Sequence, residues 1–323
     1  MHLGSTARVA VAATRDSAYG WPVKPFDQPH PVRGNLGDPR TLFHGPPNVR
    51  TLLSGAGAFQ FHFGIDISAP DGTPVYPVVS GHVVRAKGDW VTIDAGDGRT
   101  FEYWHIAPVV GVGTQVQADV TMLGRIRKGA EHVHLTERDN GVAVNPLAPG
   151  HLEPYSDHTK PRVEAVYFRR SVTSPDLMPD FLRGRIELIA SAYDLPQLPV
   201  PGAWHDLPVT PALVTWRIVD AVTQRVVVPE HTAYDVRGAM PSNKLFWTIY
   251  ARGTHQNMSV FGKHYSYMQP GRYLFRLAPG GFDTRTLPDS VYDLIVTASD
   301  IRGNTSSLGV RFSVHNKPGV VGP

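Results

Sequence analysis

The chain has 323 residues, of which 41% are hydrophobic and 18% charged, so it is too apolar for wholesale disorder and long enough for about two domains. Its 31 basic and 28 acidic residues leave a formal net charge of +3 without a long run of one sign, which argues against binding nucleic acid through a basic patch. The sequence has no cysteine, and this excludes disulfides, thiolate zinc fingers, iron–sulfur clusters and cysteine nucleophiles. No apolar stretch approaches the roughly 18 residues of a membrane-spanning helix, so we expect no membrane span.

Residues 1–18 are predicted to be an N-terminal tail. The short apolar run at 9–13 is typical of the end of a signal peptide, but the charged start and the full apolar core of such a peptide are missing. An export signal is therefore not clearly present, and a truncated one is left open.

Residues 19–153 are predicted to form an antiparallel β-domain. The sequence holds 31 glycines and 29 prolines, and breakers this dense favour short strands and many turns over a helical bundle. Short runs bounded by glycine, proline or aspartate predict the strands. These runs are 63–68, 73–78, 82–87, 90–95, 100–106, 120–126 and 132–138. The polar, proline-bounded stretch 154–163 is predicted to be a linker.

Residues 164–316 are predicted to form a β-sandwich, followed by a tail at 317–323. Apolar residues recur at every second position in 186–192, 292–298 and 310–314, which is the pattern of half-buried antiparallel strands. One short helix at 174–182 is the most that helical periodicity supports. The long loops at 196–211 and 239–263 either pack against the first domain or carry binding, and the sequence does not choose between these roles.

Polar side chains that can bind a metal stand at three places in the first domain. In a regular strand His62 and Asp66 share one face with Gly64 between them, and His132 and His134 likewise share a face. His105 ends the strand predicted at 100–106. A solvent-facing strand edge is the alternative for each pair.

Two histidines and one aspartate would leave the fourth position of a tetrahedral zinc to water, which is the open composition of a catalytic site. Zinc in such a site lowers the pKa of the bound water to about 7 and polarises a scissile carbonyl. Two further histidines would take the proton and stabilise the charged intermediate. Spacing alone does not tell the ligand from the base within the pair His132 and His134.

These residues, in this order, resemble the lysostaphin-type zinc metallopeptidases, which cleave peptide bonds in bacterial cell walls. That family has H-x-x-x-D, then a lone histidine, then H-x-H. The phrases GIDISAP at 64–70 and YWHI at 103–106 match it as well. The resemblance covers residues 19–152 and implies a small antiparallel-sheet domain of the duplicated-hairpin type.

Carried over residue by residue, the resemblance implies that His62, Asp66 and His134 bind one zinc ion per chain. His132 would be the catalytic base, and His105 would orient water or stabilise the transition state. Trp104 stands where the family often has a small residue, so it is expected to narrow the groove or to offer a stacking wall.

The predicted function is that of a zinc metalloendopeptidase that hydrolyses peptidoglycan peptides, extracellular or associated with the cell wall. The second domain looks like an immunoglobulin-type accessory module, a likeness of fold alone. A non-catalytic wall-binding regulator of another hydrolase is the main alternative, although such proteins usually lack one of the five residues. A biotinyl or lipoyl carrier fits worse, because only Lys87 lies near the required turn. The bond that is cut, a regulatory partner and the oligomeric state are left open.

Overall fold

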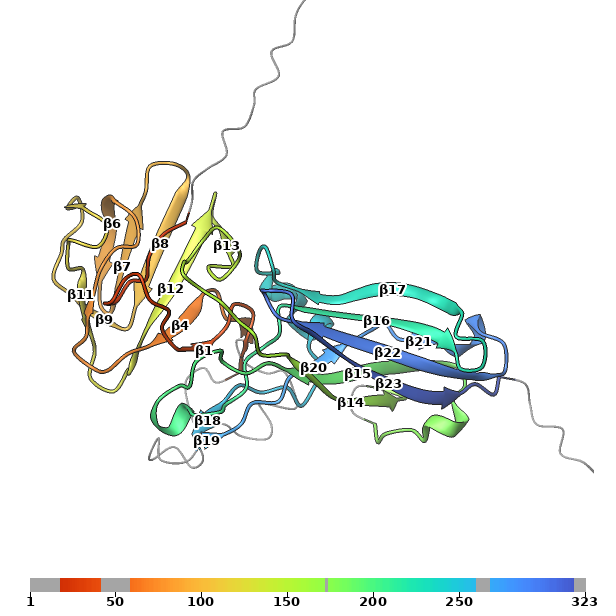
Figure 1. Cartoon of the computed structure of the whole chain (residues 1–323). Coiled ribbons are helices and arrows are strands. Elements are labelled where there is room, and N and C mark those ends of the chain that lie inside the picture. The colour runs from red at the N-terminus through yellow and green to blue at the C-terminus, as the bar shows by residue number, and fades with distance from the viewer. Residues whose placement is uncertain (1–17, 42–58, 172–173, 260–267, 317–323) are drawn as a thin grey trace, which may run out of the picture.

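The structure is a computed structural model that describes residues 18–41, 59–171, 174–259 and 268–316 (Figure 1). The tails predicted at 1–18 and 317–323 lie outside these ranges, apart from residue 18. The prediction of an antiparallel all-β chain is confirmed, because the strands pair antiparallel in both halves of the described chain. None of the described helices has the length and apolar character needed to cross a membrane.

The first domain is built on one large antiparallel sheet with the strand order β1-β4-β12-β8-β7-β6-β10, and β13 pairs with β12. A smaller sheet has the order β5-β11-β9. The strands of the large sheet are β1 (Val32–Gly34), β4 (Ile65–Ser68), β6 (Gly81–Lys87), β7 (Trp90–Asp94), β8 (Arg99–Trp104), β10 (Gln115–Val116), β12 (His132–Asp139) and β13 (Val142–Val144). Those of the small sheet are β5 (Pro74–Val75), β9 (Ile106–Pro108) and β11 (Gly124–Ile126).

Alternation along β4 and β12 decides which face of the large sheet is buried. Ile65 and Ile67 on β4, and Val133 and Leu135 on β12, are fully buried in the core of the first domain. Because successive side chains of a strand point to opposite faces, the polar residues between them lie together on the other face. This face carries the candidate site.

The second domain consists of two four-stranded antiparallel sheets. One has the order β14-β15-β20, with β21 paired to β15, and the other has the order β17-β16-β22-β23. Leu188, Trp216 and Leu294 are buried in one core with residues of both sheets, which confirms the predicted sandwich. Its strands are β14 (Arg162–Arg169), β15 (Arg185–Tyr193), β16 (Leu213–Asp220), β17 (Val226–Asp235), β20 (Leu274–Arg276), β21 (Phe282–Asp283), β22 (Val291–Ser299) and β23 (Thr305–Ser313).

Short elements fill the connections. In place of a helix at 174–182 the chain has only the 3-10 turn η1 (Pro179–Phe181). The helix α2 is a single turn that follows η3 directly. The remaining elements are β2 (Pro39–Arg40), β3 (Gln60–Phe61), η2 (Gly202–Trp204), η3 (Asn243–Leu245), α2 (Phe246–Ile249), β18 (Met258–Ser259), β19 (Met268–Gln269) and η5 (Thr284–Thr286).

The stretch predicted as a linker is packed between the two domains. Trp21 donates its indole N–H to the carbonyl of Pro154, and Tyr155 is buried with the core of the first domain. From the sandwich, Asn304 donates to the carbonyl of Asp157. The composition of the stretch is that of a free linker, but its aromatic and acidic residues are anchored on both sides.

Three buried carboxylates meet at this junction. Asp157, Asp194 and Asp300 place oxygen atoms within 4.8 Å of one another, and Asp194 is only 3% exposed. Burial, reinforced by the charges of Asp157 and Asp300, raises the pKa of Asp194 to about 8. This carboxyl is therefore mostly protonated at neutral pH, and the pH dependence of stability must reflect it.

Candidate metal centre

Strand pairing brings the candidate residues of β4 and β12 together. In the register of the two strands Asp66 lies opposite His134, and Ser68 lies opposite His132. On the other side of β12, His134 lies opposite Trp104 of β8. His105 follows Trp104 directly with a φ of +66°, and this left-handed residue separates β8 from β9.

His62 reaches the cluster by a bend and not by strand alternation. It lies between β3 and β4, outside any strand, so the assumption of one regular strand from His62 to Asp66 was wrong. The bend depends on Gly64, because a Cβ atom there would lie 2.2 Å from the carbonyl oxygen of Leu135 and 2.8 Å from Nε2 of His134.

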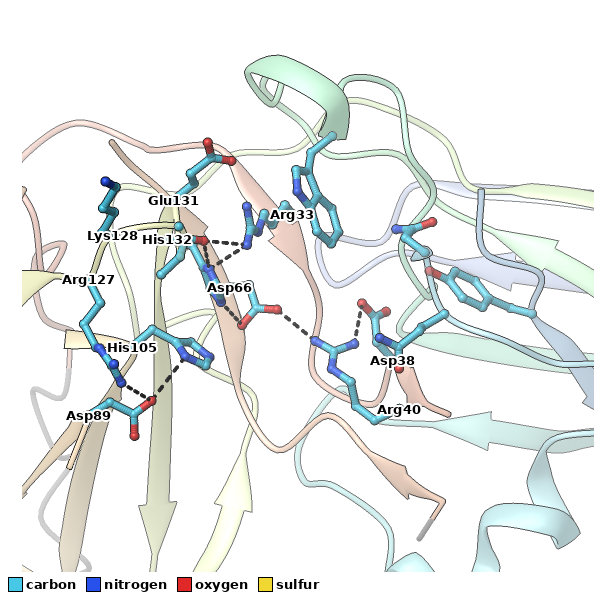
Figure 2. A pocket seen from close by; sticks show the side chains of 16 residues that line it. Arg33, Asp38, Arg40, Asp66, Asp89, His105, Arg127, Lys128, Glu131 and His132 are labelled. Atoms are coloured by element: carbon cyan, nitrogen blue, oxygen red, sulfur yellow. Dashed lines mark hydrogen bonds and ion pairs between the residues drawn. The ribbon is translucent and has the colours of Figure 1, made fainter. Parts of the chain in front are cut away.

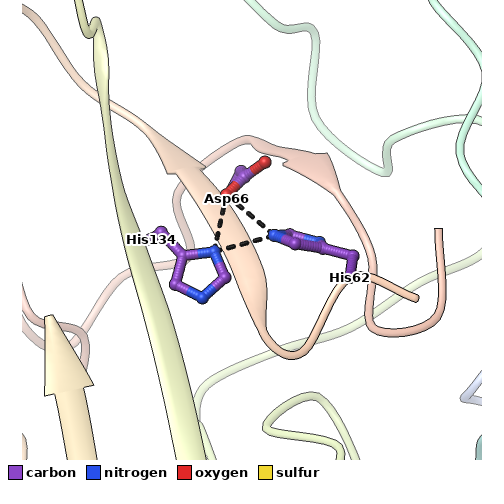
Figure 3. A group of neighbouring side chains, drawn as sticks. All are labelled: His62, Asp66 and His134. Atoms are coloured by element: carbon purple, nitrogen blue, oxygen red, sulfur yellow. Dashed lines mark hydrogen bonds and ion pairs between the residues drawn. The ribbon is translucent and has the colours of Figure 1, made fainter. Parts of the chain in front are cut away.

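His62, Asp66 and His134 converge on one point (Figure 3). Nε2 of His62 lies 2.7 Å from Nδ1 of His134. Oδ1 of Asp66 lies 3.0 Å from Nδ1 of His134 and 3.1 Å from Nε2 of His62. Ligands of a tetrahedral zinc at about 2.0–2.2 Å stand roughly 3.3 Å apart, so a small expansion around an ion is all that separates this triangle from a zinc site.

The atoms of the three side chains that face away from the cluster also have hydrogen-bond partners. Nδ1 of His62 lies 2.9 Å from the carbonyl of Asn35, and Nε2 of His134 lies 2.8 Å from the hydroxyl of Thr136. Arg40 donates to Oδ2 of Asp66 over 2.8 Å. Such outer partners fix the orientation and tautomer of metal ligands, so the donor set fits a metal ion.

The protonation states of the three side chains also suit metal binding. Burial lowers the pKa of His62 and lowers that of His134 to about 4. For Asp66, burial acts to raise the pKa, but the neighbouring imidazoles of His62, His132 and His134 hold it well below its ordinary value. Neutral imidazoles and an ionised carboxylate are the forms that bind metal ions.

His105 and His132 lie beside this triangle. Their ring centroids are 4.5 Å apart, and Nε2 of His132 lies 3.5 Å from Oδ1 of Asp66. Nδ1 of His132 lies 2.6 Å from the carbonyl oxygen of Ala130 and 2.6 Å from a guanidinium nitrogen of Arg33. Burial lowers the pKa of His105 and brings that of His132 to about 3, so both imidazoles are neutral at neutral pH.

A cavity of about 430 Å³ opens over these residues (Figure 2). From the first domain it is lined by Asp66, His105 and His132 and by the basic residues Arg127 and Lys128. The second domain completes the lining with Trp204, Gln256, Asn257 and Tyr273. The long loops at 196–211 and 239–263 therefore pack against the first domain, with 260–263 lying outside the described residues.

Trp104 does not belong to the described lining of this cavity. Its indole stacks on Trp90 with 4.4 Å between ring centroids and donates to Glu102. The role of Trp104 as a wall of the groove stays a prediction. The register places Trp104 between His134 of β12 and Trp90 of β7, on the same face of the sheet as both.

The sequence did not reveal the residues that surround the five candidate ligand and catalytic side chains. Arg33, Asn35 and Arg40 lie in the lead-in stretch before the first histidine, and Asn35 acts through its carbonyl. A backbone carbonyl leaves no signal in residue type. Trp204 contributes from the second domain, with the guanidinium of Arg33 4.2 Å from its ring centroid, and no local spacing predicts a contact across 171 positions.

The fold and the site together define a β-domain with a group of two histidines and one aspartate that could hold a metal ion. Residues 60–146 match the model of peptidase family M23. The match confirms, for this part of the chain, the resemblance seen in the sequence. No comparison tests the likeness of the second domain to immunoglobulin modules, which stays a prediction.

Three solved structures illustrate the similarity. A zinc-containing peptidase from Vibrio cholerae is 19% identical, with 40% of this chain and 39% of that chain covered and a TM-score of 0.29. A mutant catalytic domain of the prophage-encoded M23 protein EnpA from Enterococcus faecalis is 26% identical, with 40% and 98% covered and a TM-score of 0.28. A chain of the SpoIIQ–SpoIIIAH pore-forming complex is 21% identical, with 41% and 89% covered and a TM-score of 0.31.

Proposed function

We propose that the chain is a zinc-dependent endopeptidase that hydrolyses peptide bonds of bacterial cell-wall peptidoglycan. The observation that carries the proposal is the convergence of His62, Asp66 and His134 on one point, beside two neutral histidines and below an open cavity. The family match at residues 60–146 supports it. An extracellular or wall-associated location follows from this substrate and is proposed with it.

Zinc would be held by Nε2 of His62, Oδ1 of Asp66 and Nδ1 of His134. When bound, it supplies the Lewis acidity that acidifies water and polarises a carbonyl. The buried position of His62 and His134, each 3% exposed, keeps these ligands out of contact with the substrate.

His132 is placed to act as the general base. The base role requires the tautomer whose Nδ1 donates to the carbonyl of Ala130 and not the one whose Nδ1 accepts from Arg33. In that tautomer Nε2 carries the lone pair and is placed to accept the proton of the attacking water. His105 packs against the His132 ring on the cavity side, and its imidazole is placed to hydrogen-bond the developing oxyanion. Asp89, 3.8 Å from Nδ1 of His105, helps to orient that ring.

Digestion of purified peptidoglycan sacculi by the zinc-loaded full chain tests the proposal. We expect released fragments whose new termini, read by mass spectrometry, name the cleaved bond, and we expect a chelator to abolish their release. His158→Ala is a suitable control, because this histidine is exposed and belongs neither to the cavity lining nor to the group that could hold the metal. Sacculi that stay intact while the chain holds one zinc would contradict the peptidase and favour the wall-binding regulator.

A further inference from the structure

One short segment binds the outer atoms of two of the three metal-holding side chains. The carbonyl of Asn35 accepts from Nδ1 of His62 at 2.9 Å, and Arg40 donates to Oδ2 of Asp66 at 2.8 Å. Figure 2 shows Arg40 between Asp66 and Asp38, and its guanidinium lies 3.6 Å from the Asp38 carboxylate. The segment 35–41 therefore sets the orientation of one imidazole and of the carboxylate.

The same segment is hydrogen-bonded to the second domain. The backbone N–H of Thr210 donates to Oδ1 of Asp38 at 2.7 Å, and the side-chain amide of Asn35 donates to the carbonyl of Thr210 at 3.0 Å. The hydroxyl of Tyr250 donates to the carbonyl of Gly37 at 2.8 Å. Asp38 is 3% exposed, so these bonds are sheltered from competing water.

Apolar packing anchors the segment in the same place. Leu36 belongs to the buried core of the sandwich. Gly37 has a φ of +86°, and a Cβ atom there would lie 1.9 Å from the hydroxyl oxygen of Tyr234, so the tyrosine side chain lies closer to this backbone than any residue but glycine would allow. Phe61, the residue before His62, packs in that core as well, with ring centroids 5.7 Å from those of Tyr250.

We infer that the second domain is a positioning part of the metal centre, acting on His62 and Asp66 through the segment 35–41. The identity of the metal in this inference rests on the proposed function. Outer partners of metal ligands typically change metal affinity 10- to 100-fold when they are removed, because the ligands then lose their preset orientation. In this chain those partners are themselves held by the sandwich, so loosening the domain contact weakens zinc binding.

The inference is tested with Tyr250→Phe in the full chain, which removes the hydroxyl that binds Gly37 and keeps the ring. We expect the zinc Kd, measured by competition with a chromogenic chelator, to rise about tenfold. Tyr292→Phe is the matched control, since this tyrosine of the sandwich also donates its hydroxyl to a backbone carbonyl at 2.8 Å, that of Pro288. The control is expected to keep the wild-type Kd at a comparable loss of thermal stability.

Asn35→Ala gives a second, independent arm. It removes the bond to Thr210 while the carbonyl that faces His62 stays in the chain, and we expect the zinc Kd to rise in the same way. A Kd equal to that of the wild type in both variants would overturn the inference and leave the proposed function intact. If the wild-type chain bound zinc but did not hydrolyse peptidoglycan, the proposed peptidase activity would be wrong. The comparison of zinc Kd values would still decide the positioning role.

Discussion

At the scale of single residues, the candidate metal centre depends on side chains that the sequence identifies and on hydrogen-bond partners that it does not. The spacing of His62, Asp66 and His134 was visible, since imidazole and carboxylate side chains in a family pattern have few other uses. Their partners were not visible, because a carbonyl such as that of Asn35 can come from any residue. Arg40 reaches Asp66 only because the chain folds back.

Gly64 is the residue whose small size the centre requires most directly. Gly64→Ala would place a Cβ atom 2.2 Å from the Leu135 carbonyl and 2.8 Å from Nε2 of His134. We expect a loss of about 1–3 kcal/mol in unfolding free energy, together with weakened zinc binding, measured by chemical denaturation and by metal analysis. Gly111→Ala serves as the control, since a Cβ atom at Gly111 would meet nothing within 4 Å; equal effects of the two variants would contradict the prediction.

At the scale of elements, β12 organises the site. His132, His134 and Thr136 alternate with Val133 and Leu135, which are fully buried on the opposite face. This alternation is the reason that the sequence predicted β12 well, whereas His62 was misassigned to a strand. A bend stabilised by a close backbone contact has no periodic signature.

Thr136 tests the role of this strand in orienting a ligand. Its hydroxyl lies 2.8 Å from Nε2 of His134, and Thr136→Val keeps the shape while removing that partner. We expect the zinc Kd to rise about tenfold, measured by chelator competition. Ser68→Ala on the adjacent strand β4 is the comparison, because this buried hydroxyl has no hydrogen-bond partner in the part of the chain that the structure describes; a similar rise there would count against a specific role of Thr136.

At the scale of the whole molecule, the two domains form one unit around the cavity. Sequence patterns predicted a β-domain and a sandwich, but they assigned the site to the first domain alone. The cavity is lined from both, and Trp204 and Tyr273 enter it from segments far from the histidines in the chain. Contacts of this kind follow from the packing of surfaces and not from local periodicity, which is why the sequence did not reveal them.

The three buried carboxylates at the domain junction predict how the stability of the chain depends on pH. Asp194 has a folded-state pKa of about 8 and an unfolded value near 3.9, so between these values the folded chain binds the extra proton. Its contribution to stability therefore falls as the pH rises from about 4 to about 8. Asp194→Asn lacks this titration, and we expect it to raise the Tm relative to the wild type at pH 8, by roughly 1–2 °C for each kcal/mol regained.

The measurement is thermal unfolding of both proteins at pH 5 and at pH 8. The advantage of the variant should be larger at pH 8, where the wild type must either keep the proton on Asp194 or bury its charge. An advantage that is the same at both pH values would show that Asp194 does not titrate in this range.

The central claim is that His134 holds the metal while His132 performs chemistry beside it. The most direct test measures the zinc content and the peptidoglycan hydrolysis of His134→Ala and His132→Ala in parallel. We predict that His134→Ala loses both zinc and activity, whereas His132→Ala keeps one zinc per chain and loses activity by about 100-fold or more. Full zinc content and full activity in His134→Ala would contradict the account.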